Sequence, residues 1–326
     1  MTDADTNPAP EQPPQIRTIC GFWRRVAAFL LDSLLLGIIG FILGLAFYAD
    51  FARMGASGRW IGFAIALAYF ALLNSAAGGG QTLGKRIMRI EVVDRAGRHI
   101  PLARSALRYV ILGAPFFLNG ALIEPAHRVL LAVAAVTVFW IGPSIIYLYV
   151  FNRRTRQSLH DLAVGSYVVD SPGGGAPAAG AVWRPHLAVV GCIALCAAAL
   201  IPLSSLVYHL GMISDLVAVQ AKVSGSGEFS GVGIMKGVNM VYKSGTSMTT
   251  RTLSVTASVR SRASLSEPVA GRAAAIVLNS YPGAGDEDLI SVKLRYGYDI
   301  GISSSWISRS FEHSPLGWGR MLPPAP

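Results

Sequence analysis

The sequence has little charge and few cysteines, and both shortages limit what kind of protein it can be. Charged residues make up 14% of the 326 residues, against about 25% in soluble globular proteins. With an apolar content of 52% and a mean hydropathy of +0.47, this argues against a soluble enzyme, a disordered tail or a nucleic-acid-binding protein. The cysteines are odd in number and absent from the C-terminal third, so no disulfide framework is predicted: Cys20, Cys192 and Cys196.

Acidic residues are scarcer than basic ones, and long apolar runs are plentiful. The chain has 18 Asp and Glu against 28 Lys and Arg, a formal net charge of +10. In so apolar a chain, this balance indicates Lys and Arg at the cytoplasmic side of a membrane. Transmembrane helices are predicted at five runs, residues 26–48, 60–77, 109–123, 129–150 and 186–208. The third run is short and contains Pro115 and Asn119, so a re-entrant hairpin is an alternative there.

Basic residues set the predicted orientation. The segments after the second and fourth runs are both rich in Arg and Lys, and both can be cytoplasmic only if the chain crosses twice between them. Arg24 and Arg25 ahead of the first run place the N-terminus in the cytoplasm. Residues 120–127 and the segment after residue 208 then lie outside. We expect a disordered cytoplasmic tail at 1–20, a Gly- and Pro-rich linker at 171–185 and an extracytoplasmic domain at 209–326.

Beyond residue 208, apolar and polar residues alternate at every second position. This alternation predicts half-buried antiparallel strands at 251–260 and 289–296, and the apolar run 273–278 predicts a more buried strand. Residues 210–223 are predicted to continue the fifth helix. The predicted fold class is an α-helical polytopic membrane protein, with a four-helix module, a fifth transmembrane helix and a C-terminal β-rich domain.

Two opposite charges stand out in the first predicted helix. Arg25 and Asp32 are seven residues apart, so they point the same way but lie about 10.5 Å apart along the axis, too far for a direct ion pair. Asp32 would lie well inside the hydrocarbon, at a cost of about 2.5–3.5 kcal/mol. We therefore expect it to contact a polar or cationic group from another segment, with these candidates: Lys85, Arg86, Arg108 and Arg25.

Three further motifs follow in order. They are Gln81-Thr82-Leu83-Gly84-Lys85-Arg86, then Ile90-Glu91-Val92-Val93-Asp94, and then Gln157-Ser158-Leu159-His160-Asp161-Leu162-Ala163-Val164-Gly165. With the Arg25–Asp32 helix and the expected helices between them, they resemble the RDD family of bacterial integral membrane proteins over about residues 21–170. The fifth helix and the C-terminal domain lie outside this resemblance.

The resemblance implies a four-helix module in the bacterial plasma (inner) membrane. The family is named for one arginine and two aspartates, which match Arg25, Asp32 and Asp161 of this sequence. Ser166 stands where the family usually has threonine, which keeps the hydroxyl. The supporting residues for this polar network are Lys85, Arg86, Arg108 and His160.

Two functions remain open at this point. Some members of the family are linked to sodium–proton exchange, and a membrane aspartate near an arginine is compatible with ion-coupled transport. The same residues could equally form a static network in a non-enzymatic scaffold or sensor whose distal domain binds a protein partner. We favour the second, because more than a third of the chain lies in a distal domain that a bare exchanger would not require.

Other sites are not indicated. Gly79 to Lys85 has P-loop spacing, but Arg86 replaces the Ser or Thr that would bind magnesium, and the loop follows a membrane helix instead of a strand. Lys85 and Arg86 are expected to meet anionic lipid headgroups. The six histidines show no metal-ligand spacing, and no nucleophile with a paired base is visible. We therefore predict no cofactor, no metal, no nucleic-acid partner and no enzyme activity.

Two glycine-containing motifs have alternative interpretations. Gly40 and Gly44 allow close approach of another helix, either within the protomer or in a homo-oligomer. The segment Gly297 to Gly301, near Trp306 and Trp318, could line a binding surface or could be a turn beside an ordinary aromatic core.

Overall fold

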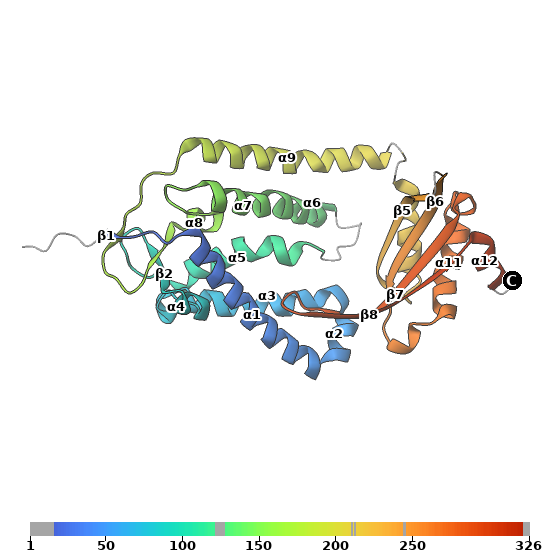
Figure 1. The fold of residues 1–326 in the computed structure, drawn as a ribbon, viewed down its shortest axis with the longest axis horizontal. Helices are drawn as coiled ribbons and strands as arrows, with labels where there is room; N and C mark the ends of the chain where they lie inside the picture. Colours follow the sequence, from blue (N-terminus) through green and yellow to red (C-terminus); the bar gives the residue numbers. More distant parts are fainter. Residues whose placement is uncertain (1–15, 121–127, 210, 212, 244–245, 322–326) are drawn as a thin grey trace, which may run out of the picture. The chain divides into compact units, whose positions relative to one another are not determined.

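The structure is a computed structural model that describes residues 16–120, 128–209, 211, 213–243 and 246–321 (Figure 1). Most of the predicted tail, residues 1–15, and most of the predicted outer loop, residues 121–127, lie outside the described residues. The chain divides into two units. One comprises the described residues within 1–35, 65–116 and 136–195, and the other those within 36–64, 117–135 and 196–326.

Helices occupy all five predicted apolar runs. Within the described residues, three helices are long and apolar enough to cross a membrane: α1 (Phe22–Ala46), the continuous segment Val129–Phe151, and α9 (Arg184–His209). The second of these joins α6 (Arg128–Val136) to α7 (Gly142–Phe151) through a π-helical turn, Thr137–Ile141. A fourth span results if α2 (Tyr48–Met54) and α3 (Arg59–Leu73), which are bent by 110°, act together.

The third predicted run begins earlier than expected. Helix α5 extends over Leu102–Leu118, with Pro115 inside it, so its first turns carry Arg104 and Arg108. The apolar run is shorter than the helix because the N-terminal part of α5 contains charged side chains and only its C-terminal part is continuously apolar. The charged N-terminal part of α5 brings Arg108 into the first unit's interior, where it is buried.

The segments between the helices form small ordered elements in the first unit. After α3 come the short helix α4 (Leu83–Ile87) and strand β2 (Ile90–Asp94); after α7 come helix α8 (Leu159–Val164) and strand β3 (Ser166–Asp170). Strands β2 and β3 pair antiparallel, with Val92 opposite Val168. Their valines are buried, which makes this ladder a small apolar core that fixes the two motif-bearing segments to each other.

The predicted disordered tail, 1–20, extends too far. Residues Ile16–Arg17 form strand β1, which pairs in parallel with β4 (Ala176–Pro177) in the predicted linker. Arg17 is buried and forms an ion pair with Glu91 of β2. A charged side chain that is buried needs such a partner, and the position of that partner was not visible from the local sequence.

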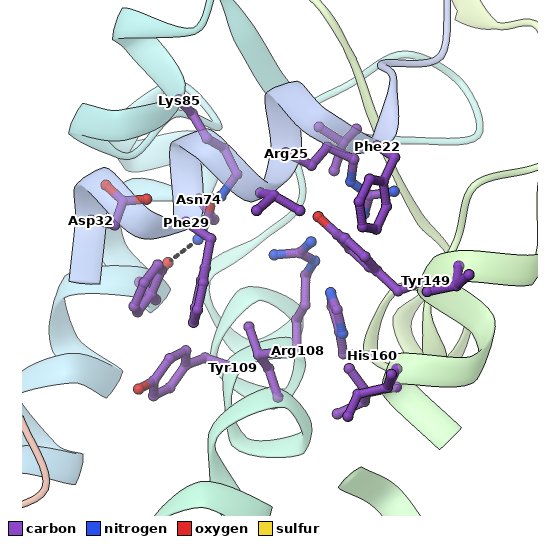
Figure 2. A pocket seen from close by; sticks show the side chains of 17 residues that line it. Phe22, Arg25, Phe29, Asp32, Asn74, Lys85, Arg108, Tyr109, Tyr149 and His160 are labelled. Atoms are coloured by element: carbon purple, nitrogen blue, oxygen red, sulfur yellow. Dashed lines mark hydrogen bonds between the residues drawn. The ribbon is translucent and has the colours of Figure 1, made fainter. Parts of the chain in front are cut away.

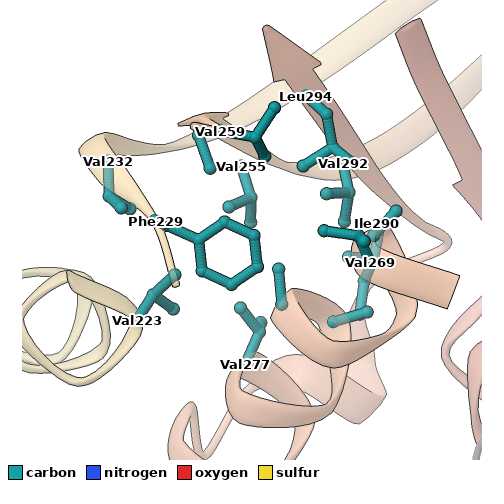
Figure 3. Close-up of a cluster of buried hydrophobic side chains, with 14 of the residues drawn as sticks. Val223, Phe229, Val232, Val255, Val259, Val269, Val277, Ile290, Val292 and Leu294 are labelled. Atoms are coloured by element: carbon teal, nitrogen blue, oxygen red, sulfur yellow. The ribbon is translucent and has the colours of Figure 1, made fainter. Parts of the chain in front are cut away.

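The C-terminal domain is an α+β fold. Strands β5 (Ser230–Lys243), β6 (Thr246–Ser258), β7 (Leu289–Asp299) and β8 (Ser304–His313) form one sheet in that order. Helices α10 (Ser214–Gly225), α11 (Glu267–Ser280) and α12 (Pro315–Met321) pack against one face of it (Figure 1). Figure 3 shows Phe229 between the strand valines and Val277 of α11.

Two of the three predicted strands in this domain exist, and the third is a helix. The runs 251–260 and 289–296 fall in β6 and β7, but 273–278 lies inside α11. Ala270, Ala273, Ala274 and Val277 are buried at helical spacing on one face, and a short apolar run cannot distinguish this pattern from a buried strand. Strand β6 is antiparallel to β5 and β7 is antiparallel to β8, as predicted, but β6 and β7 are parallel to each other because α11 crosses over between them.

The predicted continuation of the fifth helix is also wrong. Helix α9 ends at His209, and a separate helix α10 begins at Ser214. Gly211 has a φ of +76°, which no continuing right-handed helix can contain. Residues 210 and 212 lie outside the described part of the chain.

Candidate functional site

Asp161 is positioned first by its own helix, α8. It occupies the first turn of α8, where the backbone N–H groups have no partners within the helix and favour a carboxylate. The N–H of Ser158 donates to Asp161 Oδ2 at 3.3 Å, and the Ser166 hydroxyl donates to Oδ1 at 3.1 Å. The serine at 166 therefore supplies the hydroxyl that was expected there.

Two arginines from distant helices complete the surroundings of Asp161. Arg108 of α5 donates to Oδ1 through Nε at 2.9 Å and Nη2 at 2.7 Å, and Arg25 of α1 forms an ion pair with Oδ2. Arg25 also donates to the carbonyl oxygen of Arg156. Asp161 is 0% exposed, and both arginines are buried. This buried triad joins α1, α5 and α8.

Asp32 has a different set of partners. Its Oδ1 accepts from the Tyr69 hydroxyl at 2.7 Å and from the Gly84 N–H at 2.8 Å, and its Oδ2 accepts from the Thr82 hydroxyl at 2.6 Å. Asp32 is 1% exposed. The expected polar partners from other segments are thus present, but they are neutral donors, and no hydrogen bond or ion pair among the described residues joins Asp32 to Arg25, Lys85, Arg86 or Arg108.

The Asp32 contacts hold the N-terminus of α4 against α1. Thr82 is the N-cap of α4 and accepts from the Lys85 N–H, while Gly84 presents its N–H to Asp32. A Cβ at Gly84 would overlap the carbonyl oxygen of Ala28, so glycine lets α4 approach α1 closely. The Gly79–Lys85 motif, which has P-loop spacing, therefore donates hydrogen bonds to the carboxylate of Asp32 in the same chain.

Lys85 and Arg86 have different environments although they are adjacent. Lys85 is buried, and its Nζ donates to Asn74 Oδ1; Asn74 Nδ2 donates in turn to the Phe70 carbonyl oxygen at 2.8 Å. Arg86 is exposed and contacts the Gly78 carbonyl oxygen. Of the two residues expected to meet anionic lipid headgroups, Arg86 is therefore exposed at the surface, whereas Lys85 faces the interior of the first unit.

His160 lies beside the triad. Its Nε2 is 3.7 Å from Asp161 Oδ1, and its Nδ1 is buried without a hydrogen-bond partner among the described residues. His160, Arg25, Asp32, Lys85 and Arg108 all line one cavity in the first unit (Figure 2).

Burial and neighbouring charges set the ionisation of the groups outside the predicted spans. Burial alone would raise the pKa of Asp161, but Arg108, His160 and Arg25 outweigh it and hold that pKa far below its usual range. Burial lowers the pKa of His160 to about 3, against the opposing effect of Asp161. Burial and Arg108 lower the pKa of Lys85 to about 7. Asp161 is therefore a stable anion and His160 is neutral.

Several residues of this site were not found from the sequence. Tyr69, Thr82 and Asn74 hold Asp32 and Lys85, and Tyr149 lies with its ring 5.1 Å from the Arg25 guanidinium. Thr82 stood within a motif that we had recognised and could have been identified as a capping residue. Tyr69 and Tyr149 lie on helices whose sequences show only apolar periodicity, and Asn74 lies in the turn directly after α3.

A second contact region lies in the other unit, where the tip of the β7–β8 hairpin meets α1 and α3. A Cβ at Gly44 would overlap the Tyr298 hydroxyl, one at Gly40 would lie 2.8 Å from Ser303 Cβ, and one at Gly62 would overlap the Ile300 carbonyl oxygen. The glycine pair of α1 thus packs within the protomer, but against a hairpin and not against a helix. In the segment Gly297 to Gly301, residues 297–299 end β7, and Ile300 and Gly301 begin the turn of that hairpin.

An ion pair and a cluster of rings close this contact. Arg59 at the start of α3 donates to Asp299 Oδ2 at 2.7 Å and to the Phe117 carbonyl oxygen at 3.1 Å. Tyr298 packs edge-on against Tyr48 at 5.3 Å between ring centroids, and lies 5.7 Å from the ring of Phe51. Among these residues Tyr298 is 2% exposed.

The helices long and apolar enough to cross a membrane, and the buried Arg–Asp network that ties α1 to α5 and α8, indicate an integral membrane protein. Residues 19–165 match the model of the RDD family. The chain therefore carries an RDD domain, and the resemblance over about residues 21–170 is confirmed.

A relative that matches over nearly the same number of residues supports this assignment. The chain is 26% identical over 148 residues to the uncharacterized protein YckC of Bacillus subtilis (strain 168), covering 45% of this chain and 82% of that protein. No solved structure matches the chain significantly. Among the described residues, no group of three or more His, Cys, Asp or Glu side chains could hold a metal ion.

Proposed function

We propose that this protein is a non-enzymatic scaffold or sensor of the bacterial plasma membrane, with an RDD domain as a rigid anchor and an extracytoplasmic C-terminal domain that binds a protein partner. The observation that carries the proposal is the docking of the β7–β8 hairpin on α1 and α3. The hairpin gives the C-terminal domain a direct mechanical contact with membrane helices, through which binding at the sheet could be communicated to those helices.

The same contact supports the orientation. Helix α1 begins next to Arg24 and Arg25, which favour the cytoplasmic side, so its C-terminal half approaches the outer surface. The hairpin meets α1 at Gly40 and Gly44, in that half. An extracytoplasmic C-terminal domain is the arrangement that lets a hairpin reach these residues without crossing the bilayer.

The partner surface in this proposal is the sheet face opposite the helices. Strands β6, β7 and β8 present short polar side chains there, among them Ser254, Thr256, Ser291 and Ser310, in register across the sheet. Arg295 lies over the Trp306 ring at 4.6 Å on β7 and β8. Tryptophan and arginine are the residue types that contribute most to binding at protein interfaces, so the Arg295–Trp306 pair is the feature of this face that supports a protein partner.

The alternative function, ion-coupled transport of the sodium–proton exchange type, requires a carboxylate that changes its partners during a cycle. Asp161 is held by two arginines, and Asp32 by three donors, one of which is a fixed backbone N–H. Every carboxylate oxygen of Asp161 and Asp32 thus has at least one donor within the protein, which favours a static network over an ion cycle.

Ion flux in proteoliposomes separates the two functions. We expect wild-type protein to give no sodium or proton flux above empty liposomes, and Asp32→Asn to lower thermal stability, because an amide cannot accept all three hydrogen bonds. Wild-type flux that disappears in well-folded Asp32→Asn protein would establish transport and refute the proposal.

The hairpin contact is tested by hydrogen exchange in the full-length protein. Asp299→Asn removes the ion pair with Arg59 and should increase exchange in both the hairpin and the start of α3. Asp286→Asn is the matched control, because Asp286 is exposed in a turn of the same domain. Equal exchange in the two variants and the wild type would mean that the contact does not couple the domain to the helices.

A further inference from the structure

The first unit contains a cavity of about 270 Å³ between α1, α3, α5, α7 and α8. Its polar side is formed by Arg25, Lys85, Arg108 and His160. Its other side is apolar and includes Phe29, Leu112 and Ile146. In Figure 2 the Arg108 guanidinium and the Tyr149 hydroxyl point into the middle of the cavity, and Asp32 lies at its edge.

The apolar side opens where lipid would cover the helices. Phe29 on α1 is 46% exposed, and Ile146 on α7 is 66% exposed. Both lie on helices long and apolar enough to cross a membrane, so their exposed surfaces face hydrocarbon. A hydrocarbon chain can therefore reach the cavity from the side.

The polar side has an excess of positive charge. When Lys85 is protonated, three cations, Arg25, Lys85 and Arg108, lie near two carboxylates, Asp32 and Asp161, which leaves one positive charge in excess. Asp161 is shared by the two arginines, so Lys85 is the cation without a carboxylate partner within the described residues; its Nζ contacts the neutral Asn74. A buried cation of this kind favours an anionic ligand.

Hydrogen-bonding capacity is also unused at the same place. His160 lines the cavity, is 3% exposed, and its Nδ1 has no partner among the described residues. Arg108 uses Nε and Nη2 for Asp161, and its Nη1 has no hydrogen bond to a described residue. A buried polar atom without a partner, such as His160 Nδ1, is costly, so an acceptor in the cavity would be stabilising.

We propose that this cavity binds one anionic phospholipid of the surrounding leaflet, with its headgroup phosphate at Lys85, Arg108 and His160 and an acyl chain on the apolar wall between α1 and α7. A phosphate oxygen accepts from all three groups, and the chain covers Phe29 and Ile146. The lowered pKa of Lys85 agrees with this assignment, since an anion beside the amine would restore its charge. The site is independent of the scaffold or sensor role.

The test compares lipids on purified full-length protein in detergent. Phosphatidylglycerol should raise the unfolding temperature and remain bound in native mass spectrometry. Phosphatidylcholine with the same acyl chains and inorganic phosphate alone should do neither. Lys85→Gln should weaken phosphatidylglycerol binding roughly tenfold, the loss expected for one charge-assisted contact. Arg86→Gln is the matched control: it removes the same charge one residue later, at an exposed side chain, and should leave binding unchanged.

A second variant tests the site without changing its charge. Ile146→Trp fills the apolar opening and should also weaken phosphatidylglycerol binding, so the proposal remains testable if Lys85→Gln fails to fold. Equal weakening in Lys85→Gln and Arg86→Gln would mean only diffuse surface attraction and would refute the site. Stabilisation by phosphatidylcholine or by inorganic phosphate to the same degree as by phosphatidylglycerol would refute the assignment to an anionic lipid.

Discussion

Asp161 neutralises two buried arginines and lies in the first turn of α8, so the first unit depends on its charge. Asp161→Asn leaves Arg25 and Arg108 buried without an anion, and we expect a loss of about 3–5 kcal/mol of stability. Asp170→Asn is the control, because the Asp170–Arg24 pair is partly exposed and should contribute about 0–1 kcal/mol. Unfolding of both variants in detergent checks this; equal losses would contradict it.

His160 should give the protein a specific sensitivity to acid. The folded state keeps His160 neutral down to its pKa of about 3, whereas in the unfolded chain a histidine binds a proton at about pH 6.5. Below about pH 6.5 the unfolded state therefore binds more protons, and stability falls as the pH decreases toward 3. The groups facing His160 are Asp161, Arg108, Arg25 and Lys85.

The measurement is unfolding temperature against pH for three proteins. His160→Asn should remove part of the decrease between pH 6.5 and 3, whereas the same change at the exposed His209 should leave the profile as in the wild type. The remaining decrease, at lower pH, belongs partly to Asp161, whose lowered pKa acts in the same direction. A His160→Asn profile identical to that of the wild type would show that His160 titrates alike in both states.

At the scale of elements, the glycines of α1 differ in what they permit. A Cβ at Gly44 would overlap the Tyr298 hydroxyl, whereas one at Gly37 would meet the Ile302 carbonyl oxygen at 3.8 Å, an ordinary contact. Gly44→Ala should therefore displace the hairpin and cost about 1–3 kcal/mol. Gly37→Ala should be neutral or gain up to about 1 kcal/mol from helix propensity.

Thermal unfolding and hydrogen exchange of the hairpin distinguish these two alanine variants. The comparison is informative because both substitutions add the same methyl group to the same helix. If Gly44→Ala and Gly37→Ala behaved alike, the hairpin would not rest on α1.

The elements also show where prediction from sequence succeeds. Apolar runs located α1, the α6–α7 segment and α9, since a helix in lipid must satisfy its backbone hydrogen bonds internally and needs continuous apolar side chains. The run 273–278 was misassigned because six apolar residues fit a strand or one face of a helix equally well. Packing against the neighbouring elements, and not the run itself, determines that these residues form helix α11.

At the scale of the whole molecule, the topology is the prediction to test first. With Cys20, Cys192 and Cys196 replaced, a single cysteine at exposed Ser261 should react with an impermeant reagent in intact cells, and one at exposed Arg154 only after permeabilisation. The reason is that the basic segment around Arg154 favours the cytoplasmic side. Labelling of Ser261→Cys only after permeabilisation would reverse the orientation.

Sequence alone determined the membrane class, the positions of the long helices and the RDD motifs, because these depend on local composition and spacing along one chain. It also indicated that Asp32 needs polar partners, since an ionised carboxylate in hydrocarbon is costly.

Tertiary structure alone decided which partners those are. Tyr69, Thr82 and Gly84 are 37, 50 and 52 residues from Asp32 in sequence, and Arg108 is 53 residues from Asp161. The sequence offers more cations than the two aspartates can pair with. It also contains many hydroxyl and backbone N–H donors, and nothing in the local sequence shows which of them will lie near an aspartate. The fold selects among them by distance and burial, which depend on how the helices pack and on the close approaches that Gly84 and Gly44 permit.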